Sequence, residues 1–197
     1  MQSLKTVNLT AAKSFVPLSG EFSKLGISDD TQSLFVRDSY ISLYRAVWLP
    51  KPSRKKRIQT TDKRAIIEGT PGVGKSMFGV YVLLRLLQQG VGPVVWVNKS
   101  GYVIFAGNQV EQFQGKFRSP QEKWSGWILY NKVAPYLTPV TGVNVLLLSS
   151  MREEVWYQFE TYYGAQTWYL PLWQMDELTM LRDACYPSVK NEVLEKR

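Results

Sequence analysis

A glycine-rich segment, residues 69–76, reads Gly-Thr-Pro-Gly-Val-Gly-Lys-Ser and matches the spacing G-x-x-x-x-G-K-[ST]. Its three glycines let the backbone adopt positive φ and approach a ligand without a Cβ in the way. Successive N–H groups can then face one anion, and a helix beginning near Lys75 adds the partial positive charge of its N-terminus. Such a loop binds a di- or triphosphate, with the Lys75 ammonium on the β- and γ-phosphates and the Ser76 hydroxyl on Mg²⁺.

The surrounding sequence supports this interpretation. A short apolar strand is expected at residues 65–68, before the loop, and an amphipathic helix at residues 77–89, after it. At ordinary glycine frequencies a chance match in a chain of this size is on the order of one in a hundred. We therefore expect ATP, or another nucleoside triphosphate, and Mg²⁺ as cofactors. The predicted cofactor-binding residues are Gly69, Thr70, Pro71, Gly72, Val73, Gly74, Lys75, Ser76 and Met77.

The acidic residue that usually accompanies such a loop is missing. Nucleoside triphosphatases of this kind hold magnesium with a second, acidic residue at the end of a buried strand. The two most apolar predicted strands, residues 127–130 and 145–148, are followed by Asn131 and by two serines. We expect Ser76 and Asn131 to face the metal. Because an amide neutralises no charge, ATP hydrolysis is expected to be weak or absent.

Three charged residues after the second of these strands are further catalytic candidates beside Lys75. Arg152 could contact a γ-phosphate, and either Glu153 or Glu154 could replace the missing acid. Acids are also common in the first turn of a helix, where they favour the helix dipole, and an arginine there can simply pair with them. Both interpretations stand on the sequence.

The amino-acid composition excludes several other classes of function. The chain has 197 residues, 45% of them hydrophobic, and a net charge of +8. It contains no histidine, which excludes Ser-His-Asp catalysis and histidine-ligated metal within it, and its single cysteine, Cys185, is expected to be a small buried residue. No apolar stretch approaches the roughly 20 residues of a membrane span, so we expect no membrane partner. Residues 1–20 lack the apolar core of a signal peptide, which favours the cytoplasm or nucleus.

A basic segment precedes the glycine loop. Seven positive charges fall within fourteen residues: Lys51, Arg54, Lys55, Lys56, Arg57, Lys63 and Arg64. Such a run can be a solvated loop, a nuclear-import signal, or a patch that binds nucleic acid or a host protein. Charge alone does not separate these alternatives.

Alternation of strands and helices predicts an α/β three-layer sandwich with a mainly parallel sheet. We divide the chain into an N-terminal arm (1–34), a P-loop domain (35–187) and a C-terminal tail (188–197). Residues 107–125 show no clear period and are expected to form an inserted loop. Beyond those named above, strands are predicted at 93–97, 102–105 and 168–170, and helices at 35–48, 152–163 and 176–185.

Three stretches, residues 35–44, 66–81 and 169–178, occur in an order that resembles the P-loop ATPase domain of Crinkler effectors and of retrotransposon hot spot proteins. The resemblance implies an AAA+-like or STAND-like fold with a nucleotide loop at residues 69–76 and a sensor region at residues 149–152. The sequence leaves the oligomeric state open and is compatible with oligomerisation. The resemblance also implies action in a host cell, often in the nucleus. The strand acid would fall at Asn131, and the lid with its second sensor would lie beyond the end of this chain.

Two other functions are compatible with the same motif. One is a nucleic-acid-binding module that uses the basic segment and is gated by nucleotide. The other is a nucleoside or small-molecule kinase, which would need a carboxylate after the second strand, where residues 97–99 offer Val-Asn-Lys. The loop contacts phosphates, so it does not disclose the base.

Overall fold

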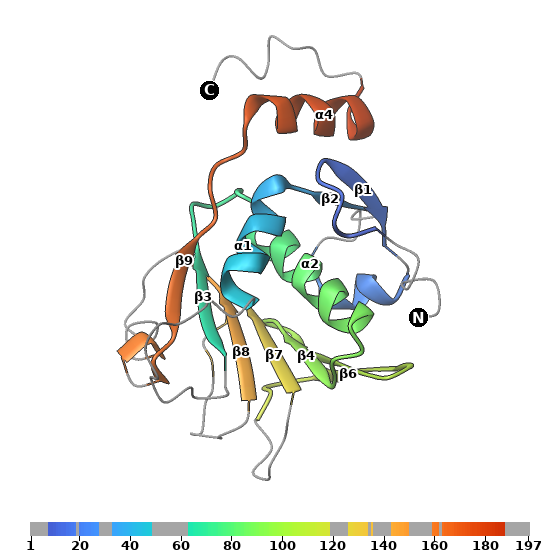
Figure 1. The fold of residues 1–197 in the computed structure, drawn as a ribbon. Helices are drawn as coiled ribbons and strands as arrows, with labels where there is room; N and C mark the ends of the chain where they lie inside the picture. Colours follow the sequence, from blue (N-terminus) through green and yellow to red (C-terminus); the bar gives the residue numbers. More distant parts are fainter. Residues whose placement is uncertain are drawn as a thin grey trace.

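The protein is built around a seven-stranded sheet, in which five parallel strands are followed at one edge by an antiparallel hairpin (Figure 1). The computed structural model describes residues 8–18, 20–27, 33–48, 63–118, 126–133, 135, 143–149, 159–161 and 163–187. The strand order is β6-β5-β4-β7-β8-β3-β9, in which β4, β7, β8, β3 and β9 run parallel to one another, while β5 is antiparallel to both β4 and β6. The strands are β3 (Arg64–Glu68), β4 (Val94–Val97), β5 (Gly101–Ala106), β6 (Gln109–Gln114), β7 (Gly126–Asn131), β8 (Val143–Leu148) and β9 (Gln166–Tyr169).

Two helices cover one face of this sheet, α1 (Asp38–Trp48) and α2 (Lys75–Gln88) (Figure 1). Gly79 lets α2 approach the sheet closely, because a Cβ there would lie 2.9 Å from Cζ3 of Trp96. The opposite face carries a second apolar cluster, to which Tyr130 and Phe159 belong. The central strands are buried on both faces, which explains their continuous apolar sequences. The protein is thus α/β, with a mostly parallel sheet flanked by helices, an arrangement compatible with a three-layer sandwich.

The segment before α1 packs on this body. Strands β1 (Ser14–Pro17) and β2 (Ser33–Val36) pair antiparallel, and a 3-10 helix, η2 (Gly20–Leu25), lies between them. Leu9 and Leu25 are fully buried in the main core. Trp96 anchors η2, because its indole N–H donates to the carbonyl of Leu25 at 3.1 Å.

Two predicted elements differ from the structure. The helix expected at residues 35–48 begins only at Asp38, because Phe35 and the residue after it pair with β1. The loop expected at residues 107–125 contains strand β6, which pairs with β5 along its whole length. As an exposed edge strand, β6 lacks the apolar alternation that identifies a half-buried strand.

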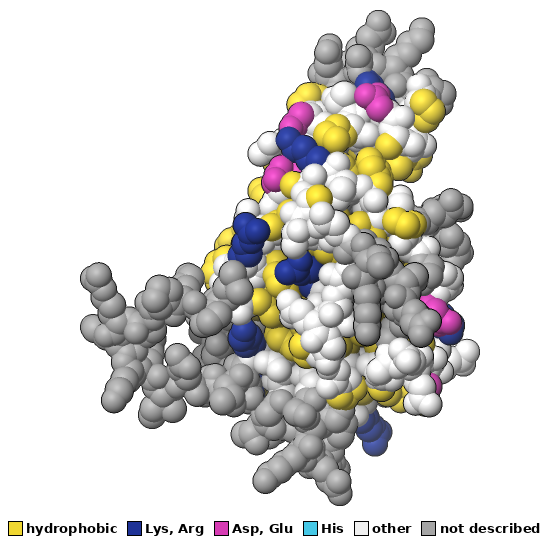
Figure 2. All heavy atoms as spheres, turned by 45° about the vertical axis from the view of Figure 1, so that its right-hand side comes forward, with side chains coloured by type: hydrophobic (Ala, Val, Ile, Leu, Met, Phe, Trp, Pro, Cys, Tyr) yellow, Lys and Arg dark blue, Asp and Glu magenta, His cyan; other side chains and the backbone are white. Residues whose placement is uncertain are grey.

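The last element, α4 (Met175–Cys185), lies beyond the end of α1, and its single buried residue is Glu177 (Figure 1). Cys185 was expected to be buried and is exposed, since this end of α4 projects away from the core. Figure 2 shows hydrophobic side chains gathered over the upper part of the molecule, where α4 lies. Among the helices in the described residues, none is long and apolar enough to cross a membrane.

Candidate functional site

The glycine loop joins β3 to α2 at the carboxyl end of the parallel strands, the edge where open α/β sheets bind ligands. Gly72 and Gly74 have φ of 85° and 96°, in the left-handed region that side chains rarely adopt. A Cβ on Gly74 would also overlap the Tyr40 hydroxyl, and one on Gly69 would lie 3.1 Å from the carbonyl oxygen of Leu170. Both backbone conformation and space therefore require glycine in this turn.

Lys75, at the first position of α2, folds back along the loop. Its ammonium donates to the carbonyls of Gly69 at 2.6 Å and of Thr70 at 2.7 Å, and the residue is 6% exposed. Burial lowers the pKa of Lys75 from its usual value, and the positive charge of Lys132 lowers it further. The lysine that the motif assigns to the phosphates thus lies at the loop, within the electrostatic reach of a second lysine.

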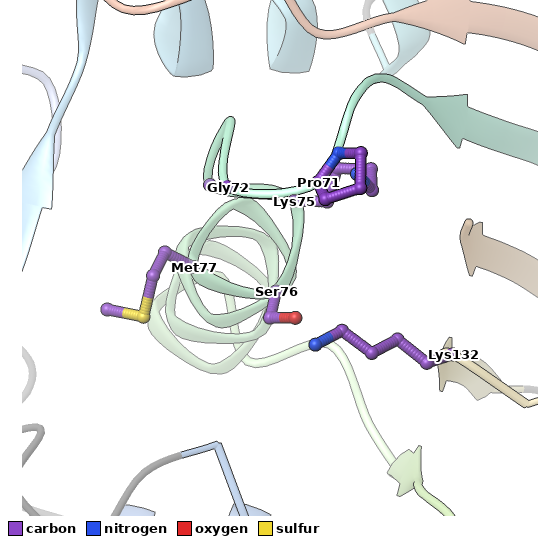
Figure 3. A pocket seen from close by; sticks show the side chains of 7 residues that line it. Pro71, Gly72, Lys75, Ser76, Met77 and Lys132 are labelled. Atoms are coloured by element: carbon purple, nitrogen blue, oxygen red, sulfur yellow. The ribbon is translucent and has the colours of Figure 1, made fainter. Parts of the chain in front are cut away.

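Ser76 and Asn131, the predicted metal pair, lie in contact. The Ser76 hydroxyl donates to Oδ1 of Asn131 at 2.9 Å, so the end of β7 meets the first turn of α2. Lys132 follows with a left-handed φ of 56°, and its N–H donates to the carbonyl of Leu148 at 3.1 Å. Figure 3 shows its side chain extending toward Ser76.

Two adjoining cavities surround this contact. The first has a volume of about 330 Å³ and is lined by Pro71, Gly72, Gly74, Lys75, Ser76, Met77 and Lys132 (Figure 3). The second has a volume of about 200 Å³ and is lined by Gly26, Ile27, Ser76, Asn98, Lys99, Ser100, Asn131 and Lys132. They share Ser76 and Lys132, so Lys132, which the sequence interpretation did not include, lies at the centre of the site.

The donors at this site do not fit Mg²⁺. Magnesium in proteins is held by carboxylates together with water and substrate oxygens. No Asp or Glu is among the described residues that line the two cavities, and Glu68, the acid before the loop, lines neither. No group of three or more His, Cys, Asp or Glu side chains that could hold a metal occurs in the described residues. Arg152, Glu153 and Glu154, the other predicted catalytic residues, lie outside them.

A buried arginine, Arg37, forms hydrogen bonds that support the glycine loop. Arg37, between β2 and α1, is 1% exposed and donates to the carbonyls of Val73 and Leu172, each at 2.8 Å. It also forms an ion pair with Glu177 at 2.9 Å, in which both side chains are almost fully buried. The same carboxylate accepts the N–H of the N-cap residue of α4 at 3.1 Å. The loop, the segment after β9 and α4 are therefore joined through one side chain.

Two aromatic residues complete this support, which we call the Arg37 clamp (Arg37, Tyr40, Trp173 and Glu177). The Tyr40 hydroxyl donates to the carbonyl of Gly74 at 2.8 Å, and the Trp173 indole to that of Gly72 at 3.0 Å. The Arg37 guanidinium lies over the Trp173 ring, 4.2 Å from its centre. Carbonyls of three consecutive loop residues are thus fixed by side chains from distant segments. Sequence reasoning assigned these side chains no role, although they lie in the stretches that carry the family resemblance.

Two further predictions concern the basic segment and the residues after the second strand. Lys51 and the basic residues up to Arg57, the predicted nucleic-acid or host-protein patch, lie outside the described residues. For a kinase, a carboxylate was expected after the second strand. There the structure places Asn98 and Lys99, in the wall of the second cavity.

Comparisons with known proteins relate the chain to Crinkler effectors. The chain is 30% identical over 175 residues to Crinkler effector protein 15 and to Crinkler effector protein 16, both of Phytophthora infestans. These alignments cover 82% of this chain and 26% of each relative, so the chain spans about a quarter of the curated relatives it matches. No family model and no solved structure matches. The similarity supports a Crinkler-like relationship.

Proposed function

We propose that this chain is a nucleotide-binding domain of a Crinkler-like effector, which binds ATP or another nucleoside triphosphate through residues 69–76. The observation that carries the proposal is the placement of Lys75 and Ser76 on a glycine loop at the carboxyl edge of the parallel strands. A helix N-terminus and left-handed glycines at such an edge favour an anion. The first cavity provides the space in which phosphates would meet this loop.

Hydrogen bonds from the Arg37 clamp also pre-organise the loop. A flexible loop would lose conformational entropy when a ligand orders it, which reduces affinity. Here the Arg37 clamp fixes the carbonyls of Gly72, Val73 and Gly74 through three hydrogen bonds. This pre-organisation supports binding as the function of the loop.

Hydrolysis is proposed to be weak or absent. The residue that contacts Ser76 is Asn131, an amide, in the position where an acid would bind a metal and orient water. The neighbouring side chains that line the second cavity, Lys99 and Lys132, offer no carboxylate oxygen to a metal or a water. Nucleotide binding without rapid turnover suits a domain that is switched by ligand.

The effector part of the proposal rests on the relatives. Both are named Crinkler effector proteins, and we extend that role to this chain, with action inside a host cell and its nucleus. The proposal concerns one domain, because the relatives are much longer than the aligned region.

Calorimetric titration of ATP, ADP and GTP into the wild type and Lys75→Ala, with phosphate release measured in parallel, tests the proposal. We expect micromolar binding of ATP and a loss of at least about tenfold in Lys75→Ala, because a hydrogen bond to a charged group contributes about 1.5–3 kcal/mol. Lys24→Ala, a change of a surface lysine, is the matched control and should bind like wild type. Absence of binding by the folded wild type would refute nucleotide binding, and turnover of several per second would refute weak hydrolysis.

A further inference from the structure

The disagreement between the Ser76 site and a magnesium site points to a different ligand for the phosphates. The side chains that meet beside the glycine loop are the Ser76 hydroxyl and the Asn131 amide, joined by a hydrogen bond of 2.9 Å. Each can orient a bound water, and neither carries the negative charge that offsets the dehydration of a divalent cation. The donor set is therefore neutral where a magnesium site is anionic.

Lysine side chains line the two cavities beside the Ser76–Asn131 pair. Lys132 lines both cavities and extends toward Ser76 (Figure 3), while Lys75 lines the first and Lys99 the second. Burial lowers the pKa of Lys75, and the positive charge of Lys132 lowers it further, as expected for two lysines that line one cavity. A divalent cation between them would meet like charge, whereas a polyphosphate would meet opposite charge.

Resting on the nucleotide binding proposed above, we propose that Lys132 takes the place of the divalent cation, so that the loop binds a polyphosphate without metal. Its ammonium neutralises phosphate oxygens on the side of Ser76, opposite the contribution of Lys75. The backbone supports this role. Lys132 adopts a left-handed φ of 56° immediately after β7, and its N–H is fixed to Leu148, so the side chain starts from a defined point at the sheet edge.

A site with Lys132 in place of the cation and a conventional phosphate loop bind different forms of ATP. A site of this kind takes the free tetra-anion of ATP, or another metal-free polyphosphate, and gains little from magnesium. A conventional loop takes the magnesium complex and needs the ion for tight binding. The difference is measurable without any enzymatic turnover.

The test is calorimetric titration of ATP into the full chain, once in EDTA and once in excess Mg²⁺. The variants are Lys132→Asn, which removes the charge and suits a left-handed backbone, and Lys132→Arg, which keeps the charge. Lys24→Ala serves as the control for loss of a surface lysine. Circular dichroism and the urea midpoint establish that each variant is folded.

We expect the wild type to bind ATP in EDTA at least as tightly as in excess Mg²⁺, which depletes the free tetra-anion. Lys132→Asn should lose about tenfold or more in EDTA, as for loss of one charge-assisted hydrogen bond. Lys132→Arg should bind within about threefold of wild type, since it keeps that charge. Wild-type binding that needs Mg²⁺, or unchanged binding by Lys132→Asn in EDTA, would overturn the inference and leave nucleotide binding standing. The first result would indicate an acid from outside the described residues. Absence of binding in both buffers would overturn both proposals.

Discussion

Replacing Glu177 with alanine should destabilise the protein far more than the loss of one contact on α4 suggests. Its carboxylate pairs with Arg37 at 2.9 Å, and the two side chains are 4% and 1% exposed. Removing one partner of a buried ion pair leaves the other charge without compensation and costs about 3–5 kcal/mol. Arg37 keeps its bonds to the carbonyls of Val73 and Leu172, so we expect the lower part of that range, about 3 kcal/mol.

The free energy of unfolding in urea, measured for wild type and Glu177→Ala, gives this quantity directly. For a chain of this size, about 3 kcal/mol corresponds to a fall in Tm of roughly 6–12 °C. Asp176→Ala is the matched control, because Asp176 is the preceding acid on α4 and pairs with Lys13 at the exposed surface. It should change stability much less. A loss below about 1 kcal/mol in Glu177→Ala would refute the idea that this pair joins α4 to the loop.

Three further predictions concern single side chains. Gly79→Ala should lower the free energy of unfolding by about 1–3 kcal/mol, because α2 would be pushed from the sheet; Gly20→Ala, which has open space, should be near neutral, and equal effects would contradict the close packing. Tyr130→Phe should stabilise by about 1 kcal/mol, because the buried hydroxyl has no hydrogen-bond partner in the part of the chain the structure describes. Burial raises the pKa of Tyr130, so the wild type should lose stability as the pH rises above about 10, where the unfolded chain ionises first; the urea midpoint of the variant should fall less steeply with pH, and parallel curves would contradict this. Asn131→Asp should raise phosphate release in Mg²⁺ about tenfold, and no increase would show that the strand residue does not limit hydrolysis.

The strand–loop–helix unit could be predicted because its signals are local. Glycine spacing, the apolar strand before it and the amphipathic helix after it all lie within about thirty residues, as in any βαβ unit. The structure confirms the strand and the helix, and it brings Ser76 and Asn131 into contact although they are distant in sequence. That pairing was accessible because parallel strands end at one edge of a sheet.

The parts that could not be predicted depend on long-range contacts. Arg37 looks like an ordinary charged residue at the start of a helix, and only the fold shows it buried between the loop and α4. Strand β6 is held by pairing with β5 and not by an apolar face of its own, so its sequence shows no period. The exposure of Cys185 follows from the projection of α4, which no local pattern records. Lys132 could have been predicted as a site residue only by considering the residue after Asn131, the position where an acid was expected.

The most direct test of the central claim is hydrogen–deuterium exchange of the backbone amides of residues 72–77, measured with and without ATP. If phosphates bind against this loop, these amides should exchange about tenfold more slowly with ATP, as expected for N–H groups that gain a hydrogen-bond partner. The protection should disappear in Lys75→Ala. Binding of ATP with unchanged exchange at residues 72–77 would contradict the account, because the nucleotide would then bind at another part of the protein.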